Sequence, residues 1–525
     1  MSHDPTPRGV LLVADRVVTL GAERTEARAV LVRGSRIVWL GADPEQAPPH
    51  RSRVELPGCV IGPAFVDAHV HLTTTGLALG GLDLTGVVRR SEVLEQVAAH
   101  AAQHPGRVVW GQGLDPQRLR DPVPTPDQLA RAAGGRAVYL TQVDGHAGLV
   151  DRATLLSAPL ARAQGVDRDH TGAPTGRLRR EANHIARRWA VGAMSRAELQ
   201  AARRRAITRA AALGIASLHE MAGPDQMGGE DLDAWLEDDW PVEIVPYWAG
   251  LDLEEAVARN LRHAGGDVLL DGSLGAHTAA LSEPYHDRPE ASGHLELDDD
   301  SLTEWLLAGT RAGLQLGVHA IGDAALRQLL SALRAVEDRL ASERQPQVVR
   351  RLRHRVEHGV VIPPELSAPL AELGVVVSGQ PAFEPRFGGE TGLYAARLGP
   401  QRRGWTNPFR QLLDAGVHVA FGSDSAENPL DPWTGVQAAT APQREDRAIT
   451  RCQALHLATL GGRYAARQER YVGVLRPGMR ADLAAFAGDP YRAEDPRGTR
   501  AVLTLVQGRV AHGDAPLPDA PGRSS

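Results

Sequence analysis

Histidine and carboxylate side chains stand at the ends of several apolar segments, where a metal-binding enzyme would need them. His69 and His71 are two positions apart at the end of one such segment. Residues i and i+2 of a strand point the same way, so both imidazoles can reach one ion. His319, His358 and Asp424 end further apolar segments along the chain. The recurrence of this arrangement predicts one metal site built from strand ends.

These residue types suit hydrolysis by metal-activated water. Neutral imidazoles and a carboxylate bind a borderline ion such as Zn²⁺ and leave one position open for water, which the ion acidifies. A carboxylate that touches both ion and water can take the water's proton and later give it to a leaving amine. We predict this role for Asp424. His358 either binds a second ion or hydrogen-bonds the attacking water and polarises the substrate.

The segments that carry these residues alternate with helical patterns, which is typical of βα units. Eight strands are expected, the number that a closed barrel needs, at 59–69, 214–220, 242–248, 267–273, 314–320, 353–359, 374–380 and 417–424. The helix before the second strand should begin with a capping box, Ser195 to Glu198, and end at Gly214. The predicted fold is therefore α/β, a (β/α)₈ TIM barrel with its active site at the carboxyl ends of the strands.

Shorter alternating segments near both ends of the chain predict a small composite β-sandwich outside the barrel. Its parts are residues 1–60 and 471–515, with the barrel at 61–470 and a flexible tail at 516–525. Residues 75–190 are too long for one βα connection and contain their own strands and helices. We expect them to form an insertion that overhangs the active-site face.

Composition excludes several other classes of protein. The 525 residues have a net charge of −6, and all 58 basic residues are arginine, so no mechanism can use a lysine amine, a P-loop lysine or a carbamylated lysine. Two cysteines are too few for a disulfide framework. The first residues lack the apolar core of a signal peptide, and no apolar segment is long enough to cross a bilayer. A cytoplasmic enzyme with a small-molecule substrate, and no nucleic-acid or membrane partner, is expected.

The motifs resemble those of the amidohydrolase superfamily, and within it the YtcJ-like branch that includes N-substituted formamide deformylases. The matching stretches are PAFVDAHVHL, HAIGDAA, EHG and GSDSAENPLDP at the strand ends, with DGHAGL, PTGRLRREA, DGSLGAHTAAL, QPAFE and GVLRPGMRADLAAF elsewhere. The resemblance covers nearly the whole chain. It implies a barrel with a composite β-sandwich, a divalent metal and hydrolysis of a C–N bond. It carries the metal ligands over to His69, His71, His319, His358 and Asp424.

One position departs from the pattern of these relatives. They often have a lysine four residues before the aspartate of DGSLG, and when carbamylated it can bridge two metals. This chain has Asp267 there. An aspartate reaches several ångströms less far, which favours one tightly held ion, with Asp267 as a candidate ligand. A second ion bridged by Asp267 or by Glu220 is the alternative.

Five further residues are candidates for substrate contact. His146 lies in the insertion, His219 and Glu220 end the second strand, and Asp271 and His277 lie just beyond the expected fourth strand. The alternative for each is a structural role, in a turn, in the core or in loop hydrogen bonding.

The leading functional hypothesis is hydrolysis of a small amide, formamide or N-acyl compound. An aminohydrolase is the closest alternative, but deaminases with this barrel commonly have a glutamate three residues after the fifth-strand histidine, and this chain has Gly322. The sequence does not distinguish hydrolysis of a linear amide from hydrolysis of a cyclic amide or lactone. A catalytically silent metal-binding protein is the alternative from another class, and the retained ligands argue against it. A homodimer is expected only from the resemblance.

Overall fold

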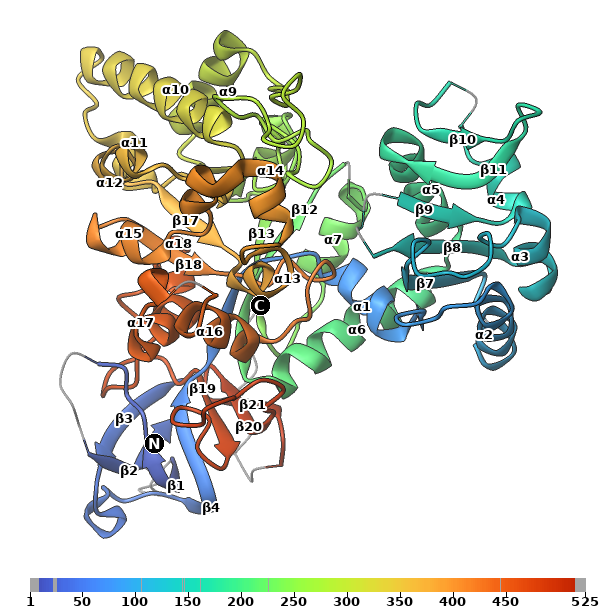
Figure 1. Ribbon diagram of the computed structural model, residues 1–525. Coiled ribbons are helices and arrows are strands. Elements are labelled where there is room, and N and C mark those ends of the chain that lie inside the picture. Colours follow the sequence, from blue (N-terminus) through green and yellow to red (C-terminus); the bar gives the residue numbers. More distant parts are fainter. Residues whose placement is uncertain are drawn as a thin grey trace.

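The computed structural model describes residues 9–21, 26–104, 106–143, 145, 147–160, 162–224, 226–443 and 445–514. Figure 1 shows a central barrel, a sheet near both chain ends below it, and a third sheet to one side. Within the described part of the chain, no helix combines the length and the apolar character required to cross a membrane.

Eight parallel strands form the barrel and confirm the predicted fold class. In spatial order they are β5 (Phe65–Val70), β12 (Ile215–Ala222), β13 (Glu243–Trp248), β14 (His263–Ala264), β15 (Gln315–Ala320), β16 (Arg355–His358), β17 (Val376–Gly379) and β18 (His418–Phe421). Every residue of β5 and β12 is buried, as expected for parallel strands covered by helices. The chain after β18 closes the barrel, because the amide of Asp424 donates to the carbonyl of His69 at 2.8 Å and the amide of His71 donates to Ser425 at 2.8 Å.

Two predicted strands were wrong in their bounds. Residues 59–63 belong to β4 (Ser52–Pro63) in another sheet, and only the segment from Phe65 onward enters the barrel. The fourth barrel strand is β14, not residues 267–273. Gly265 and Gly266 follow β14 with φ of +77° and +84°, a conformation that ends the strand. Beyond them only Leu269 pairs with the barrel, through an isolated parallel bridge to His319 in β15.

Helices surround the barrel, and the first long one matches its prediction. The barrel helices include α6 (Arg196–Ala212), α7 (Gly229–Glu237), α8 (Leu253–Ala258), α9 (Asp299–Arg311), α10 (Asp323–Ser342), α11 (Val348–Leu352), α12 (Ser367–Leu373), α15 (Phe409–Asp414), α16 (Pro432–Thr440), α17 (Arg451–His456) and α18 (Gly462–Ala465). The predicted capping box of α6 is present, since Ser195 and Glu198 bond reciprocally, and Gly214 follows with a φ of +79°. The loops above the barrel contain α1 (Leu72–Gly80), α13 (Glu384–Phe387) and α14 (Leu393–Arg402).

Segments from both chain ends share one seven-stranded sheet. Its order is β21 (Arg509–His512), β20 (Ala501–Val506), β19 (Leu483–Ala487), β4, β1 (Val10–Val17), β2 (Ala27–Arg33) and β3 (Arg36–Gly41). The two ends meet where β19 pairs antiparallel with β4. This pairing anchors the chain just before the first barrel strand.

A separate six-stranded sheet lies between α1 and α6 in the sequence. Its order is β10 (Val166–Arg168), β11 (Pro174–Arg179), β9 (Ala147–Val150), β8 (Ala137–Gln142), β7 (Val108–Leu114) and β6 (Leu82–Asp83). Alternate residues of its strands point to opposite faces. One face packs with α5 (Arg180–Ala193), and the other packs with α2 (Arg90–Gln103) and α3 (Pro126–Ala132); α4 (Arg152–Ser157) follows β9.

Candidate metal centre

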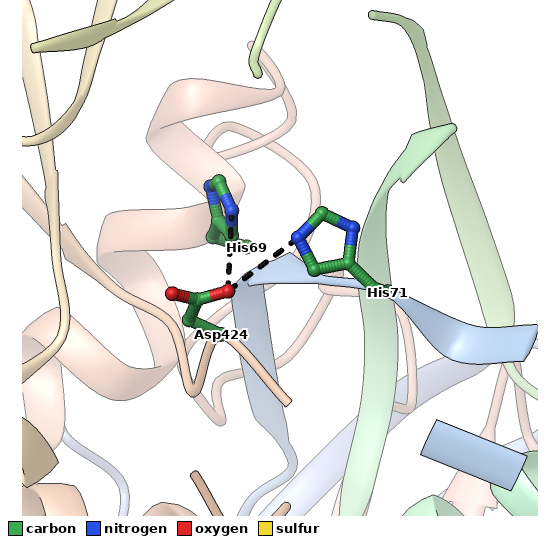
Figure 2. Close-up of side chains that lie close together, drawn as sticks. All are labelled: His69, His71 and Asp424. Atoms are coloured by element: carbon green, nitrogen blue, oxygen red, sulfur yellow. Dashed lines mark ion pairs between the residues drawn. The ribbon is translucent and has the colours of Figure 1, made fainter. Parts of the chain in front are cut away.

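The ends of the first and last barrel strands position the predicted ligands. His69 lies in β5 and His71 directly follows it, so strand alternation places both imidazoles on one side. Asp424 follows β18 and faces both rings (Figure 2). Its Oδ1 is 3.4 Å from Nε2 of His71 and 3.7 Å from Nε2 of His69. The structure thus brings together three of the residues that the sequence predicted as ligands.

Asp67 ties the two ligand-bearing segments to each other. Its Oδ1 accepts hydrogen bonds from the amide of Ser423 at 2.9 Å and from the amide of His69 at 3.2 Å. Asp424 itself has a left-handed backbone, with φ of 55°. Such a conformation in a residue other than glycine costs about 1–3 kcal/mol and persists only when neighbouring contacts hold it. The bonds from Asp67 and from the barrel closure supply those contacts.

Asp267 lies within the same cluster. Its Oδ2 is 3.0 Å from Nε2 of His71, and its Oδ1 is 3.4 Å from Nε2 of His69 and 3.8 Å from Nε2 of His358. The short strand β14 explains this position, because Asp267 follows the strand's carboxyl end instead of beginning the strand. An aspartate side chain at this position therefore reaches the imidazoles.

Hydrogen bonds on the far side of each ring leave the Nε2 atoms facing the two carboxylates. Nδ1 of His69 is 2.9 Å from Oε2 of Glu357, and Nδ1 of His71 is 3.2 Å from the carbonyl of Met221. Both partners are acceptors, so each Nδ1 donates, and Nε2 is the ring nitrogen left to bind a metal. Nδ1 of His358 likewise donates to Gln380 at 2.9 Å. Outer hydrogen bonds of this kind fix the orientation of metal-binding histidines.

Glu357 is held in its ionised form. Burial alone would raise its pKa, but the Arg355 guanidinium and His69 lower the pKa to about 2. Arg355 pairs with both carboxylate oxygens of Glu357 at 2.8 Å, and both side chains are fully buried. The negative charge therefore acts as an acceptor for His69 over the whole neutral range.

The two carboxylates in the cluster attract positive charge. Burial would raise the pKa of Asp267 and of Asp424, but the surrounding histidines hold both pKa values below the ordinary range. Burial would lower the pKa of His71, but Asp267 and Asp424 raise it well above its ordinary value. Two ionised aspartates beside three imidazoles form a centre that a divalent cation would neutralise.

His319 occupies a different position from the other predicted ligands. Its ring lies 4.4 Å from the ring of His358, between centroids, and its Nε2 is 3.5 Å from the carbonyl of Gly272. Burial lowers its pKa to about 3, so the ring is neutral. Within the described ranges, the converging ligand atoms belong to two groups that exclude His319: His69, His71 and Asp424, and His69, Asp267 and His358.

The residues present fit a divalent metal. Nε2 of His69 and Oδ1 of Asp267 are buried, and neither has a hydrogen-bond partner among the described residues. Unsatisfied polar atoms in a buried position are unfavourable. Two such atoms, 3.4 Å apart and both of ligand type, are satisfied by a cation that binds nitrogen and oxygen.

A cavity of about 730 Å³ opens above the cluster. His71, Asp267, His319, His358 and Asp424 line its floor. Its walls include the apolar and aromatic residues Leu269, Leu274, Val360, Phe383, Phe387 and Tyr394, and the polar residues Asp115, Gln117, His184 and Arg187 from the segment between α1 and α6. The centre therefore has access to a small molecule.

The second-strand candidates do not line this cavity. His219 is fully buried inside the barrel, with Nδ1 2.9 Å from Nη1 of Arg355. Glu220 points to the other face of β12 and accepts a hydrogen bond from the amide of Leu72 at 2.6 Å. Burial raises the pKa of Glu220 to about 8. Both side chains therefore contact barrel residues, and neither is part of the cavity lining.

Asp271 and His277 are not among the residues that line the cavity either. Asp271 is fully buried and accepts hydrogen bonds from the amides of Ala280, Ile321 and Gly322. His277 pairs with Asp287 at 3.2 Å. His146 lies outside the described residues.

Sequence reasoning missed the residues that orient the ligands. Arg355 and Glu357 occur two positions apart in the expected sixth strand, so they share one face. Two opposite charges on one face of a wholly buried strand indicate a paired, functional position, and this signal was available. Gln380 and Phe383 lie in the QPAFE stretch named above, but neither this stretch nor Tyr394 in α14 carries a charge pattern that would indicate its place beside the ligands.

The chain is similar to known proteins along most of its length. Residues 54–512 match the model of the amidohydrolase family. YtcJ of Bacillus subtilis (strain 168) is 26% identical over 509 residues, 88% of this chain and 91% of that protein. N-substituted formamide deformylase of Arthrobacter pascens is 26% identical over 537 residues, 92% of this chain and 94% of that protein. The crystal structure of an uncharacterized metal-dependent hydrolase from Pyrococcus furiosus superposes with a TM-score of 0.75 at 25% identity, covering 92% of this chain and 100% of that one.

Proposed function

The chain belongs to the amidohydrolase family and is a hydrolase acting on carbon–nitrogen bonds, and from this premise we propose its substrate class and the roles of its residues. The substrate is a small amide, formamide or N-acyl compound. The metal is one Zn²⁺ ion held by His69, His71, Asp267 and Asp424. The observation that carries the proposal is the convergence of two imidazole Nε2 atoms and two carboxylates, 3.0 to 3.7 Å apart, at the floor of the cavity.

The shared use of His69 favours one ion over two. Both groups of converging ligand atoms include this residue. Its Nδ1 donates to Glu357, so only Nε2 has a lone pair for a metal. Because one lone pair binds one ion, the two groups of ligand atoms that share His69 surround the same cation.

A bound Zn²⁺ would supply a Lewis acid that acidifies a water molecule. Asp424 is ionised and lines the cavity, so its carboxylate takes the proton from the attacking water. The Asp424 carboxyl group then gives that proton to the leaving nitrogen. His358 lies across the floor of the cavity, fixed by Gln380, and polarises the substrate carbonyl.

Gly322 disfavours the deaminase alternative. A Cβ atom at this position would lie 1.9 Å from the carbonyl oxygen of Ala280, so the backbone leaves no room for a glutamate there. The similarity to an N-substituted formamide deformylase supports a linear amide substrate instead. Both cysteines, Cys59 and Cys452, are free thiols, which supports a cytoplasmic location.

The test combines metal analysis with a substrate screen. We expect about one equivalent of Zn²⁺ in the purified protein and hydrolysis of at least one compound among formamides, N-acyl amino acids and cyclic amides. Asp424→Asn should abolish that activity, whereas Asp414→Asn, an exposed position of α15, should leave it unchanged. Two equivalents of metal would overturn the one-ion proposal, and full activity in Asp424→Asn would overturn the catalytic role.

A further inference from the structure

Two arginines line the cavity, and their guanidinium groups have different surroundings. Arg386, in α13, donates from Nη1 to the carbonyl of Glu427 at 2.9 Å and from Nη2 to the carbonyl of Val143. Its guanidinium also lies over the ring of Phe387, 4.9 Å from the centroid. These contacts give Arg386 a structural role at the cavity wall.

Arg187, in α5, has few partners. Its Nη2 donates to Oε1 of Gln226 at 3.2 Å, whereas its Nε is buried and has no hydrogen-bond partner among the described residues. No carboxylate in the described ranges forms an ion pair with it. A guanidinium is always charged and carries five donors. Among the described residues, Arg187 is therefore a partly buried cation with a single neutral hydrogen-bond partner, and an anion would satisfy it.

Arg187 is connected to the metal centre through one side chain. Nε2 of Gln226 donates to Oδ2 of Asp267 at 3.2 Å. Arg187, Gln226 and Asp267 all line the same cavity. Its volume of about 730 Å³ lies in the range of small-molecule sites. One molecule can therefore present its amide to the centre and another of its groups to Arg187.

We propose that Arg187 binds a carboxylate of the substrate, so that this enzyme prefers amides that carry an anionic group. The inference rests on the proposed function and adds the substrate class. A guanidinium binds a carboxylate through two parallel hydrogen bonds, which also orients the molecule. The apolar wall formed by Leu274, Phe383 and Tyr394 contacts the uncharged part of the substrate.

The reaction itself is an ordinary amide hydrolysis. The oxygen of water bonds to the acyl carbon, the C–N bond breaks, and the nitrogen takes a proton from the water. The products are a carboxylic acid and an amine that keeps the original carboxylate. No oxidant, reductant or further reactant is needed.

Two compounds that differ only in the carboxylate test the proposal. Racemic N-formylphenylalanine carries it, and N-formylphenethylamine lacks it. In the Zn²⁺-loaded wild-type enzyme we expect kcat/KM to be roughly 10- to 100-fold higher for the acid, the effect of a charge-assisted hydrogen-bond pair. Arg187→Met should remove this preference mainly through KM of the acid, with kcat/KM of the neutral compound within about threefold of wild type. Arg187→Lys should retain part of the preference.

Arg386→Met is the matched control, because it removes a cavity arginine that already has backbone partners. Any effect of this variant should be equal for the two compounds. Metal content and Tm are measured for each variant, so that loss of folding is recognised. Equal or faster hydrolysis of N-formylphenethylamine by the wild type, or an unchanged preference in a folded Arg187→Met, would overturn the inference and leave the proposed function intact. An enzyme active on other amides but on neither compound also overturns it. A metal-loaded protein inactive on the whole screen contradicts the proposed function instead.

Discussion

Glu357→Gln should weaken metal binding although Glu357 is not itself a ligand. Its carboxylate accepts from Nδ1 of His69 at 2.9 Å and pairs with Arg355 at 2.8 Å, and all three side chains are almost or completely excluded from solvent. Glutamine has the same shape but offers one acceptor oxygen and one donor group. That oxygen cannot serve His69 and Arg355 as the two carboxylate oxygens do. The His69 ring therefore loses its fixed orientation or Arg355 loses its partner.

Both effects have an expected size. Loss of the carboxylate behind a metal-binding histidine weakens metal affinity about 10- to 100-fold. This corresponds to about 1.4–2.8 kcal/mol of binding free energy. Breaking a buried ion pair on one side lowers the free energy of unfolding by about 3–5 kcal/mol, because Arg355 keeps an uncompensated charge.

Competition with a chromophoric chelator measures the Kd for Zn²⁺, and chemical denaturation of the metal-free protein measures stability. Glu243→Gln is the matched control. Glu243 pairs with Arg463 and Arg480 at the amino end of β13, at the opposite end of the barrel from the metal centre. The Glu243→Gln variant should be less stable than the wild type and should keep the wild-type affinity for Zn²⁺. A folded Glu357→Gln protein with wild-type Kd would refute the orienting role of Glu357.

Three further outcomes are expected. Burial would raise the pKa of Glu243, but Arg463 and Arg480 lower this pKa from 4.5 to about 2. The stabilisation that ionised Glu243 gives to the folded state is therefore complete above pH 4.5 and is lost as the pH falls toward 2. The free energy of unfolding should therefore depend less on pH across this range in Glu243→Gln, and identical slopes in the two proteins contradict this. Gly322→Ala should lower stability by about 1–3 kcal/mol through the clash with Ala280, whereas Gly275→Ala, whose Cβ would meet no atom closer than 3.8 Å, should have a Tm close to wild type. Chelation of the metal should lower Tm, and Zn²⁺ should restore it, because a ligand at 100 times its Kd adds about 2.7 kcal/mol to the native state; a Tm independent of chelator argues against a resident ion.

The sequence was informative where function depends on periodicity and strand ends. The i, i+2 spacing of His69 and His71 placed both rings on one face, and the carboxyl end of the last strand placed Asp424 beside them. These features follow from local geometry, so one segment at a time was enough to predict them.

Pairings between distant segments were not predictable in the same way. Glu357 meets His69 across 288 positions, and Arg187 reaches Gln226 only because the sheet between α1 and α6 lies beside the barrel. The position of Asp267 depended on where β14 ends, and the apolar residues after the two glycines resembled a full strand, although only Leu269 pairs with β15. His219 and Glu220 are neighbours in β12 that point to opposite faces, and neither of them lines the cavity.

The seam at which the barrel closes has a consequence for folding. The backbone bonds that join β5 to the segment after β18 lie at His69, His71 and Asp424, the residues that would hold the cation. A bound ion would therefore cross-link the first and last strands of the barrel. His69 and Asp424 are 355 positions apart and must meet before this cross-link forms. A growing polypeptide on the ribosome therefore cannot bind its metal until the last barrel strand has emerged. Metal binding would then be a late step, which takes place only after the barrel has closed.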